Sequence, residues 1–395
     1  MLGEPGLSEP HLSTLTGAFV INALGEGGAQ RSALVTAGAW PARSGRCIVI
    51  SARSGPYADD LPQHVPSVVL DTGWPRPVGV ARFLAGLRRT NQVHTVRTLF
   101  TNGFGLNRSV MIVKICRLLS ARVVVIERST FSAVLVERFR SGVARWAVRS
   151  LTRFLYRRAD AVVGVSEGVS QDLERTLRLP RGSVKTIHNP VDVDHIRAAI
   201  EEPPARALAD AFLSLPRPVT LNIGRLVPQK AQADLLGAFA ALPERQRGSL
   251  VILGEGPLRA DLTTQAARLG IADALWMPGF VANPWWFTAR ADVFCLSSRH
   301  EGHPRALLEA LACGTPVVST DCPHGPRETL EGVDAARLVP VNDIDALAEA
   351  LAELLDERPT VDVDLTRYRP EHIAQQYADL ARSDQPRLRD SRSVR

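Results

Sequence analysis

Short, uninterrupted apolar runs alternate with amphipathic, helix-like stretches along almost the whole chain. Runs rich in Val, Ile and Leu are typical of strands that are buried on both faces of a parallel sheet. Their regular alternation with helical stretches predicts parallel sheets covered by helices, and therefore an α/β fold of the doubly wound type. The runs are residues 49–50, 68–70, 123–126, 161–165, 219–223, 250–253, 293–296 and 316–318.

The chain is too long for a single core. At about 150 residues per domain, its 395 residues predict two or three domains. Prolines cluster at 198–218 around a short helical stretch, as they do in a linker or at a domain edge. We therefore expect an N-terminal domain over 1–200 and a second α/β domain from 201 onwards. The segment 384–395 is polar and rich in arginine, and we expect it to be disordered.

The composition is that of a folded, soluble protein, with 45% hydrophobic and 22% charged residues. The five cysteines form no CxxC pair, which argues against a disulfide framework or a zinc site and favours a reducing compartment. No basic residue precedes Arg31, so we expect no secretory signal. No apolar run reaches the roughly 18 residues of a transmembrane helix. We therefore expect a cytoplasmic protein.

The net charge of +6 is divided unevenly along the chain. Residues 1–200 contain 26 Lys and Arg against 14 Asp and Glu, whereas residues 201–395 contain 21 against 27. An excess of positive charge in one half indicates that this half meets an anionic partner.

A basic stretch stands out within the N-terminal half, because residues 138–158 contain seven arginines and no acidic residue. Arg145, Arg149 and Arg153 recur at the i, i+4 spacing of one helical stripe, and aromatic residues such as Trp146 lie between them. A basic amphipathic helix of this kind is typical of contact with an anionic membrane surface. Two alternatives stay open: a helix packed on the core with a solvated basic face, and a nucleic-acid patch.

Charged side chains follow the apolar run 219–223. Gly224 comes directly after it, Arg225 and Lys230 follow, and a helix is predicted over 233–242. A glycine lets the backbone approach a ligand closely, and a helix N-terminus offers free N–H groups at the positive end of a dipole. Two cations at this rim suit a diphosphate, although a basic surface loop has the same composition.

Two glutamates mark another loop that follows an apolar run. Glu301 precedes a helix predicted from about Pro304, and Glu309 lies inside that helix. Backbone N–H groups from Gly302 to Arg305 would face an anion or hydroxyl groups, and carboxylates accept hydrogen bonds from sugar hydroxyls. Surface glutamates are common, but Glu309 stands within an apolar run, where a carboxylate needs a partner.

Other site chemistries are disfavoured. The loop around Gly27 and Gly28 follows a strand predicted at 19–24, but it lacks the GxGxxG spacing and the acidic residue of a dinucleotide site. A dehydrogenase is therefore disfavoured. The Asp-x-Asp pairs at 192–194 and 362–364 do not clearly follow a buried strand, so we interpret them as loop residues and predict no required metal.

Taken together, the motifs resemble those of glycosyltransferase family 4. The C-terminal half carries GRLVPQK, GEGPLR, GFVANP, the two glutamates with seven residues between them, and ALACGTPVVSTDCPHGPRE. The N-terminal half carries GEGGAQR, ADAVVGVSEGV and HNPVD. The resemblance covers residues 1–383 and is weakest in the middle of the N-terminal half. It implies a GT-B fold, with two Rossmann-like domains facing each other across a cleft. The second domain would end at 365, and a helix at 366–383 would cross back to the first.

The resemblance also implies roles for individual residues. Arg225 and Lys230 would be catalytic, because they would bind the diphosphate of a nucleotide sugar and stabilise it as it leaves. Gly27 and Gly28 would approach this diphosphate from the first domain. Glu309 would hold the ribose hydroxyls.

Glu301 would be the third catalytic residue, in contact with the donor sugar. The base would lie near Phe280 and Val281. The hydroxyls of the donor sugar would be bound by the loop that follows Glu301, namely Gly302, His303, Pro304 and Arg305.

The implied activity is retaining transfer of a hexose or an N-acetylhexosamine from a nucleotide diphosphate sugar, with UDP favoured. The acceptor would be a membrane-associated glycolipid or polysaccharide precursor in a bacterial cell, and neither a metal nor another cofactor would be needed. We expect the protein in the cytoplasm, peripheral at the inner face of the cell membrane. A sugar-nucleotide epimerase of the same fold is the alternative enzyme. A nucleic-acid-binding protein is disfavoured by the acidic second half and the lack of base-stacking aromatic motifs.

The sequence departs from the family pattern at two places. His303 and Arg305 stand where relatives often carry Phe and Asn, which leaves the choice of donor sugar open. Glu127, Arg128 and Ser129 follow the fourth N-terminal strand, where many relatives have a histidine. The acceptor-side catalytic group is therefore left open as well.

Overall fold

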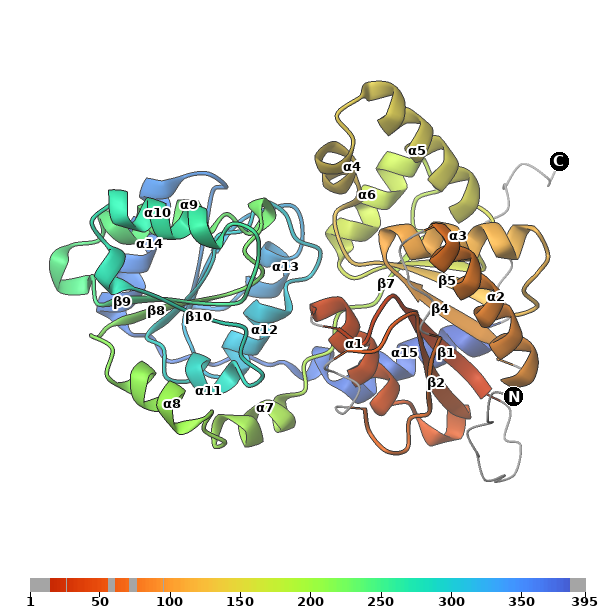
Figure 1. Cartoon of the computed structure of the whole chain (residues 1–395), viewed down its shortest axis with the longest axis horizontal. Coiled ribbons are helices and arrows are strands. Elements are labelled where there is room, and N and C mark those ends of the chain that lie inside the picture. Colours follow the sequence, from red (N-terminus) through yellow and green to blue (C-terminus); the bar gives the residue numbers. More distant parts are fainter. Residues whose placement is uncertain (1–14, 26, 56–60, 71–76, 95, 384–395) are drawn as a thin grey trace. The chain divides into compact units, whose positions relative to one another are not determined.

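The computed structural model describes residues 15–25, 27–55, 61–70, 77–94 and 96–383, which build two sheets covered by helices (Figure 1). The first sheet has seven strands in the order β3-β2-β1-β4-β5-β6-β7, and the second has six in the order β10-β9-β8-β11-β12-β13. Within the second sheet every neighbouring pair is parallel, as are the pairs from β3 to β5 in the first. The doubly wound α/β class predicted from the sequence is confirmed.

The strands of the first sheet are β1 (Leu15–Ile21), β2 (Arg46–Ser51), β3 (Ser67–Val69), β4 (Thr98–Asn102), β5 (Arg122–Glu127), β6 (Ala161–Gly164) and β7 (Val184–Thr186). Those of the second sheet are β8 (Val219–Ile223), β9 (Ser249–Leu253), β10 (Leu275–Gly279), β11 (Val293–Leu296), β12 (Val317–Thr320) and β13 (Ala336–Val339). The α-helices are α1 (Gly28–Gly38), α2 (Pro77–His94), α3 (Phe104–Ile115), α4 (Phe131–Arg138), α5 (Gly142–Tyr156), α6 (Glu167–Leu177), α7 (Val193–Ile200), α8 (Arg206–Leu213), α9 (Gln232–Ala241), α10 (Arg259–Arg268), α11 (Trp285–Thr288), α12 (Arg305–Ala312), α13 (Pro326–Leu330), α14 (Ile344–Glu357) and α15 (Pro370–Arg382).

All eight predicted apolar runs lie in or overlap a strand of this list. The strand predicted at 19–24 is corrected, because β1 ends at Ile21. Beyond it the chain leaves the sheet, and the Leu24 N–H donates to the carbonyl of Arg53 at 3.0 Å. Leu24 is nevertheless buried, which explains why an apolar pattern alone placed the strand too late.

The chain divides into two compact units. The first comprises Met1–Ile126, Ser150–Val163 and Ile373–Arg395, and the second comprises Glu127–Arg149 and Gly164–His372. The predicted domains 1–200 and 201–365 divide the chain elsewhere, and their bounds stay a prediction. The tail expected to be disordered, 384–395, lies outside the described residues.

Helix α15 corresponds to the helix expected at 366–383, and most of it belongs to the first unit. Its Tyr377 packs edge-on against Phe19 of β1 and Phe100 of β4, with ring centroids 5.5 and 5.4 Å away. Thr98 donates from its hydroxyl to the carbonyl of Ala381 in the same helix. Helix α15 is thereby tied to strands β1 and β4.

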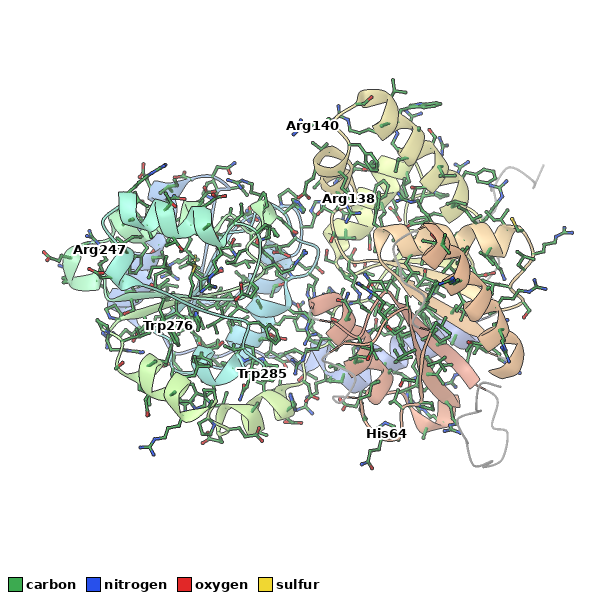
Figure 2. The ribbon with its side chains drawn as sticks, in the orientation of Figure 1. His64, Arg138, Arg140, Arg247, Trp276 and Trp285 are labelled. Atoms are coloured by element: carbon green, nitrogen blue, oxygen red, sulfur yellow. The ribbon has the colours of Figure 1, made fainter. Side chains whose placement is uncertain are left out.

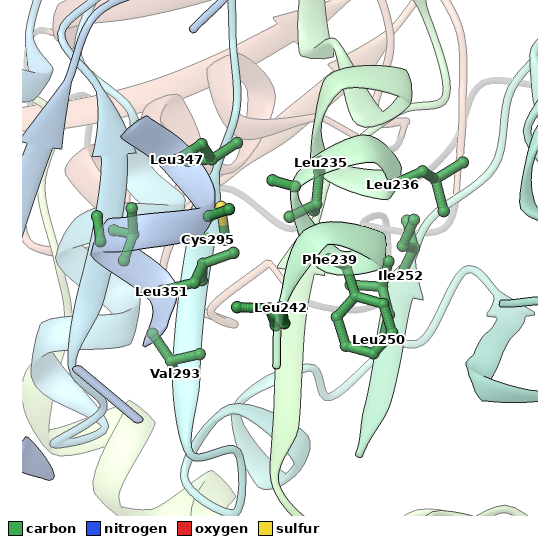
Figure 3. Packing of buried hydrophobic residues seen from close by; sticks show 14 of the residues in the cluster. Leu235, Leu236, Phe239, Leu242, Leu250, Ile252, Val293, Cys295, Leu347 and Leu351 are labelled. Carbon is green, nitrogen blue, oxygen red and sulfur yellow. The ribbon is translucent and has the colours of Figure 1, made fainter. Parts of the chain in front are cut away.

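The second sheet has a helical layer on each face, with α9, α10 and α14 on one side and α8, α11 and α12 on the other (Figure 1). Alternate residues of one strand serve the two layers, as the period of two requires. Leu250 and Ile252 pack with α9 and α14 (Figure 3), whereas Val251 and Leu253 pack with α8 and α11. Each fully buried side chain of this kind stabilises the fold by roughly 1.5–3 kcal/mol, so the sheet is a firm platform for its loops.

Glycines end three neighbouring strands of this platform and let their loops pack closely. The Gly254 N–H donates to the carbonyl of Gly279 at 2.8 Å. A Cβ atom at Gly254 would lie 2.1 Å from the carbonyl oxygen of Gly224, and its φ of +142° is one that side chains disfavour. The loops after β8 and β9 therefore meet at backbone distance, at the edge where parallel sheets bind ligands.

Candidate active site

An ion pair lies at the carboxyl edge of the second sheet. Lys230 ends the 3₁₀ turn Pro228–Lys230 that follows β8, and Glu301 lies in the loop after β11. The Lys230 Nζ atom is 2.5 Å from Oε1 of Glu301, and the Ser298 hydroxyl donates to the same oxygen at 2.7 Å. The two charged side chains are only 18% and 10% exposed, so water screens this pair less than it screens a surface pair. The structure thus brings together two of the predicted catalytic residues.

The backbone that carries Lys230 is tied to the segment that carries Glu301. The Ser297 hydroxyl donates to the carbonyl of Lys230 at 2.9 Å. The Arg299 N–H donates to the carbonyl of Gln229, whose side-chain amide donates in turn to the carbonyl of His300, each at 2.8 Å. These hydrogen bonds fix the point from which the Lys230 side chain leaves the main chain.

Arg225, the other predicted diphosphate ligand, has a different setting. Arg225 is exposed, and its backbone carbonyl accepts a hydrogen bond from the Gln232 side chain at 3.1 Å. Because Gln232 is buried in α9, this contact anchors the backbone beside Gly224 while the guanidinium extends into solvent. The Arg225 side chain can therefore move toward an anion, whereas the ammonium group of Lys230 is held by Glu301.

The loop after Glu301 offers buried hydrogen-bond donors. Within the described residues, the N–H groups of Gly302 and His303 have no hydrogen-bond partner, although both residues are buried. Buried N–H groups are nearly always paired in folded proteins. Two adjacent unpaired donors next to the Lys230–Glu301 pair indicate a place for the acceptor atoms of a ligand, which supports the predicted role of this loop.

Helix α12 begins directly after Pro304 and carries a second ion pair. Arg305 donates to Oε1 of Glu309 at 2.8 Å, and the two side chains are 10% and 14% exposed. Glu309 thus has the partner that its apolar surroundings require. Its Oε2 atom has no partner among the residues that the structure describes, and it stays available to accept a hydrogen bond from a hydroxyl. Arg305, predicted to bind the donor sugar, contacts Glu309 in this structure.

The remaining predicted ligands lie on other elements. Phe280 follows β10 with 43% of its surface exposed, and Val281 is partly buried against the core. Gly27 and Gly28 begin α1 in the first unit. The roles of these four residues in ligand binding stay predictions.

The cysteines near these loops are packing residues. Burial raises the pKa of the Cys313 thiol, and the nearby Glu309 carboxylate raises it further. Burial, again with a carboxylate as the second cause, raises the pKa of Cys322 to about 12. A thiolate is therefore disfavoured at both positions, which argues against a cysteine nucleophile.

The Asp-x-Asp pairs are loop residues with local partners. Asp192 caps α7 by accepting from the His195 N–H at 3.0 Å, and Asp364 accepts from the Thr366 N–H at 2.8 Å. The described part of the chain holds no cluster of three or more His, Cys, Asp or Glu side chains that would suit a metal ion. The predicted independence of metal is not tested by this and stays a proposal.

His303 is buried against two other rings, those of His188 at 5.0 Å and Tyr368 at 5.2 Å between centroids. The Asn189 N–H donates to its Nδ1 atom, so the neutral ring carries its proton on Nε2. Burial, followed by the charges of His188, Arg367 and Arg128, holds the pKa of His303 well below its usual range.

This buried histidine should make the fold sensitive to acid. Because the unfolded chain binds a proton at His303 near pH 6.5 and the folded chain does not, stability should fall as pH drops below about 6.5, by up to about 1.4 kcal/mol per pH unit. His303→Gln should flatten this slope in urea unfolding between pH 7 and 5. Tyr368→Phe, which alters the same cluster without a group that titrates there, should shift stability equally at each pH. An unchanged slope in His303→Gln would contradict the neutral assignment.

The basic stretch 138–158 is divided between two helices. Arg138 ends α4, Arg140 lies in the connection (Figure 2), and α5 contains the stripe. The single basic helix suggested by the sequence is therefore corrected, because Phe139 is extended and closes α4. Along α5, Thr152, Leu155 and Tyr156 face the core, whereas Val143, Trp146 and Phe154 are 76%, 61% and 45% exposed. Trp146 and Phe154 are therefore not core residues, whereas Tyr156 is.

No helix among the described residues is both long enough and apolar enough to span a membrane.

Comparison with known proteins places this site in a family. The family model described as Glycosyltransferase Family 4 matches residues 26–195, and the one described as Glycosyl transferases group 1 matches residues 209–371. Together they cover both halves of the chain and include Lys230, Glu301 and Glu309.

Curated relatives match over part of their length. The N-acetylgalactosamine-N,N'-diacetylbacillosaminyl-diphospho-undecaprenol 4-alpha-N-acetylgalactosaminyltransferase of Campylobacter jejuni is 31% identical over 52% of this chain and 54% of its own. The GDP-mannose-dependent alpha-(1-6)-phosphatidylinositol monomannoside mannosyltransferase of Mycobacterium tuberculosis is 34% identical over 45% of this chain and 48% of its own. The matched region thus spans about half of each relative.

Solved structures match along nearly the whole chain. HepE of Anabaena in complex with UDP-glucose has a TM-score of 0.69 and 22% identity, covering 92% of this chain and 96% of that one. WaaG, a glycosyltransferase involved in lipopolysaccharide biosynthesis, has a TM-score of 0.66 and 18% identity over 92% and 95%.

The two parallel sheets and these similarities define the fold as that of the GT-B glycosyltransferases, as the motifs implied. The chain belongs to glycosyltransferase family 4, and the predicted family is confirmed.

Proposed function

We propose that this protein is a retaining glycosyltransferase that moves a hexose or an N-acetylhexosamine from UDP to a membrane-associated glycolipid or polysaccharide precursor. The observation that carries the proposal is the shielded Lys230–Glu301 pair beside the two unpaired N–H groups of Gly302 and His303. Together they offer a cation for a diphosphate, and a carboxylate and two donors for sugar hydroxyls. Relatives named for nucleotide-sugar or undecaprenol-linked substrates, and a neighbour named with UDP-glucose, support the substrate classes.

The residues suggest how transfer would proceed. Departure of the nucleotide diphosphate builds negative charge at the phosphates, which Lys230, Arg225 and the donor loop would stabilise. No described side chain is an evident covalent nucleophile, and Glu301 is engaged with Lys230 and Ser298. We therefore propose attack by the acceptor hydroxyl on the face that the diphosphate leaves, without a metal ion.

The test is an assay of the full chain with a panel of UDP- and GDP-sugars, with and without lipid-linked acceptors. Transfer in the presence of a lipid-linked acceptor, with the anomeric configuration of the donor kept in the product by NMR, is expected. EDTA should leave the rate unchanged. Inversion, or loss of activity on EDTA treatment with recovery on Mg²⁺ or Mn²⁺, would overturn those parts of the proposal. Conversion of the donor sugar to its epimer without transfer would favour the alternative enzyme class.

Glu309 and Glu301 should be separable by ligand. Glu309→Ala should weaken binding of free UDP, because the carboxylate would hold the ribose hydroxyls of every uridine nucleotide. Glu301→Ala should leave UDP binding within a few-fold and cut transfer, because free UDP carries no sugar. Calorimetry with UDP on both variants is the measurement. Equal losses of UDP affinity would contradict the division of roles.

A further inference from the structure

The turn that follows β5 donates hydrogen bonds to the loop of the candidate donor site. Thr130 is 1% exposed, and its hydroxyl donates to the carbonyl of Glu301 at 2.7 Å. Its N–H donates to the same oxygen at 3.2 Å, as does the N–H of His324. Three donors on one carbonyl oxygen fix the orientation of the peptide group between Glu301 and Gly302.

Asn189 holds the same loop on the other side of Gly302. Its side-chain amide donates to the carbonyl of His303 at 2.7 Å, and its N–H donates to Nδ1 of His303 at 3.2 Å. The side-chain oxygen Oδ1 of Asn189 accepts from the guanidinium of Arg128. Asn189 is 5% exposed, so this carboxamide has little competition from water.

These contacts determine the direction of the unpaired N–H group of Gly302. In a planar trans peptide the C=O of one residue and the N–H of the next point in opposite directions. Because the Glu301 carbonyl faces Thr130, the Gly302 N–H is directed away from Thr130. A Cβ atom at Gly302 would lie 2.1 Å from the carbonyl oxygen of Arg128, so only glycine lets the loop approach this turn so closely.

We propose that Thr130 and Asn189 are positioning residues for sugar transfer, which clamp the two carbonyls flanking Gly302 so that the loop presents its N–H groups to the donor sugar. The proposal rests on the proposed function of this site. Neither residue touches the donor. Both act through the backbone of residues 301–303, from segments that are more than 110 positions away in sequence.

The chain offers substitutions that remove one hydrogen bond at a time. Thr130→Val removes the hydroxyl and keeps the shape, whereas Thr130→Ser keeps a hydroxyl. Asn189→Asp removes the donor to His303 and keeps an acceptor for Arg128. Gln246→Glu is the matched control, because Gln246 is also a buried carboxamide that donates to a carbonyl, that of Ala352 at 3.1 Å.

Steady-state kinetics with the donor and calorimetry with UDP separate positioning from folding. Thr130→Val and Asn189→Asp should each lower kcat by about tenfold while UDP affinity stays within about twofold. Thr130→Ser should recover most of kcat, and Gln246→Glu should keep it. A kcat that is unchanged in both variants, or a loss that Gln246→Glu shares, would overturn the proposal.

Hydrogen–deuterium exchange tests the positioning role of Thr130 and Asn189 without relying on the assigned activity. Thr130→Val and Asn189→Asp should speed exchange of amides in 299–305, whereas Gln246→Glu should not. If the wild-type chain transfers no sugar and the loop still loosens in the two variants, the proposed function fails and the clamp stands. If transfer occurs and exchange in 299–305 is unaltered, the clamp fails and the function stands.

Discussion

Replacing Lys230 with methionine should lower kcat/KM for the nucleotide sugar by roughly 100-fold or more, which corresponds to about 3 kcal/mol of lost transition-state stabilisation. Lys230 is the cation that the structure holds in place, through Ser297 on its carbonyl and Glu301 on its ammonium group. Methionine keeps most of the apolar stem and removes the charge. The loss should appear mainly in kcat, since negative charge at the diphosphate grows as the bond to the sugar breaks.

The control and the readout separate this role from a loss of structure. Lys185→Met makes the same change at an exposed position on β7 and should leave kcat/KM unaltered. Wild-type protein should bind UDP more tightly than UMP, and Lys230→Met should shrink this preference because the second phosphate loses its cation. A folded Lys230→Met protein with full activity, or with the UDP preference intact, would remove Lys230 from the diphosphate site.

The sequence predicted the sheets well because buried parallel strands have a strong local signal. Each predicted apolar run falls in or overlaps a strand, and the helix predicted at 233–242 is α9, Gln232–Ala241. Strands without such a run were not predicted. They include β4, with its flanking threonines, and β10, with Trp276 and a proline. Pairing with neighbouring strands, β1 and β5 for β4 and β9 for β10, makes them strands, rather than their own composition.

The candidate site was predictable only as far as its motifs are local. Glu301 and Glu309 were expected from the loop and helix that carry them, and both lie where that reasoning placed them. The pairing of Glu301 with Lys230, and of Glu309 with Arg305, depends on side-chain geometry that no spacing specifies. The contacts of Thr130 and Asn189 with the loop at 301–303 were not predicted, because the residues around them in the sequence do not indicate a contact with a loop so far along the chain. The only hint was that Asn189 belongs to a family motif, HNPVD.

The second large effect concerns α5 and a membrane. Changing Arg145, Arg149 and Arg153 together to glutamate should weaken binding to anionic vesicles by at least about 100-fold, since each arginine near such a surface contributes about 1 kcal/mol. We expect this because Val143 and Trp146 are exposed on the side of α5 that faces away from the core, and the three arginines, each partly exposed, lie between this apolar surface and the core. Arginines would meet lipid headgroups while the apolar side chains enter the interface, which gives reversible attachment without a spanning helix.

Co-sedimentation with phosphatidylcholine vesicles that contain increasing phosphatidylglycerol measures this binding. It should rise with the anionic fraction and fall at high salt, because the Debye length shortens from about 10 Å at 0.1 M to about 3 Å at 1 M. Changing the exposed Arg206, Arg245 and Arg268 to glutamate alters the net charge equally on other helices and should have a much smaller effect. Trp146→Ala should weaken binding at every salt concentration, since its contribution is apolar. If the two triple variants lose binding equally, net charge alone explains the attachment, and α5 is not the docking surface.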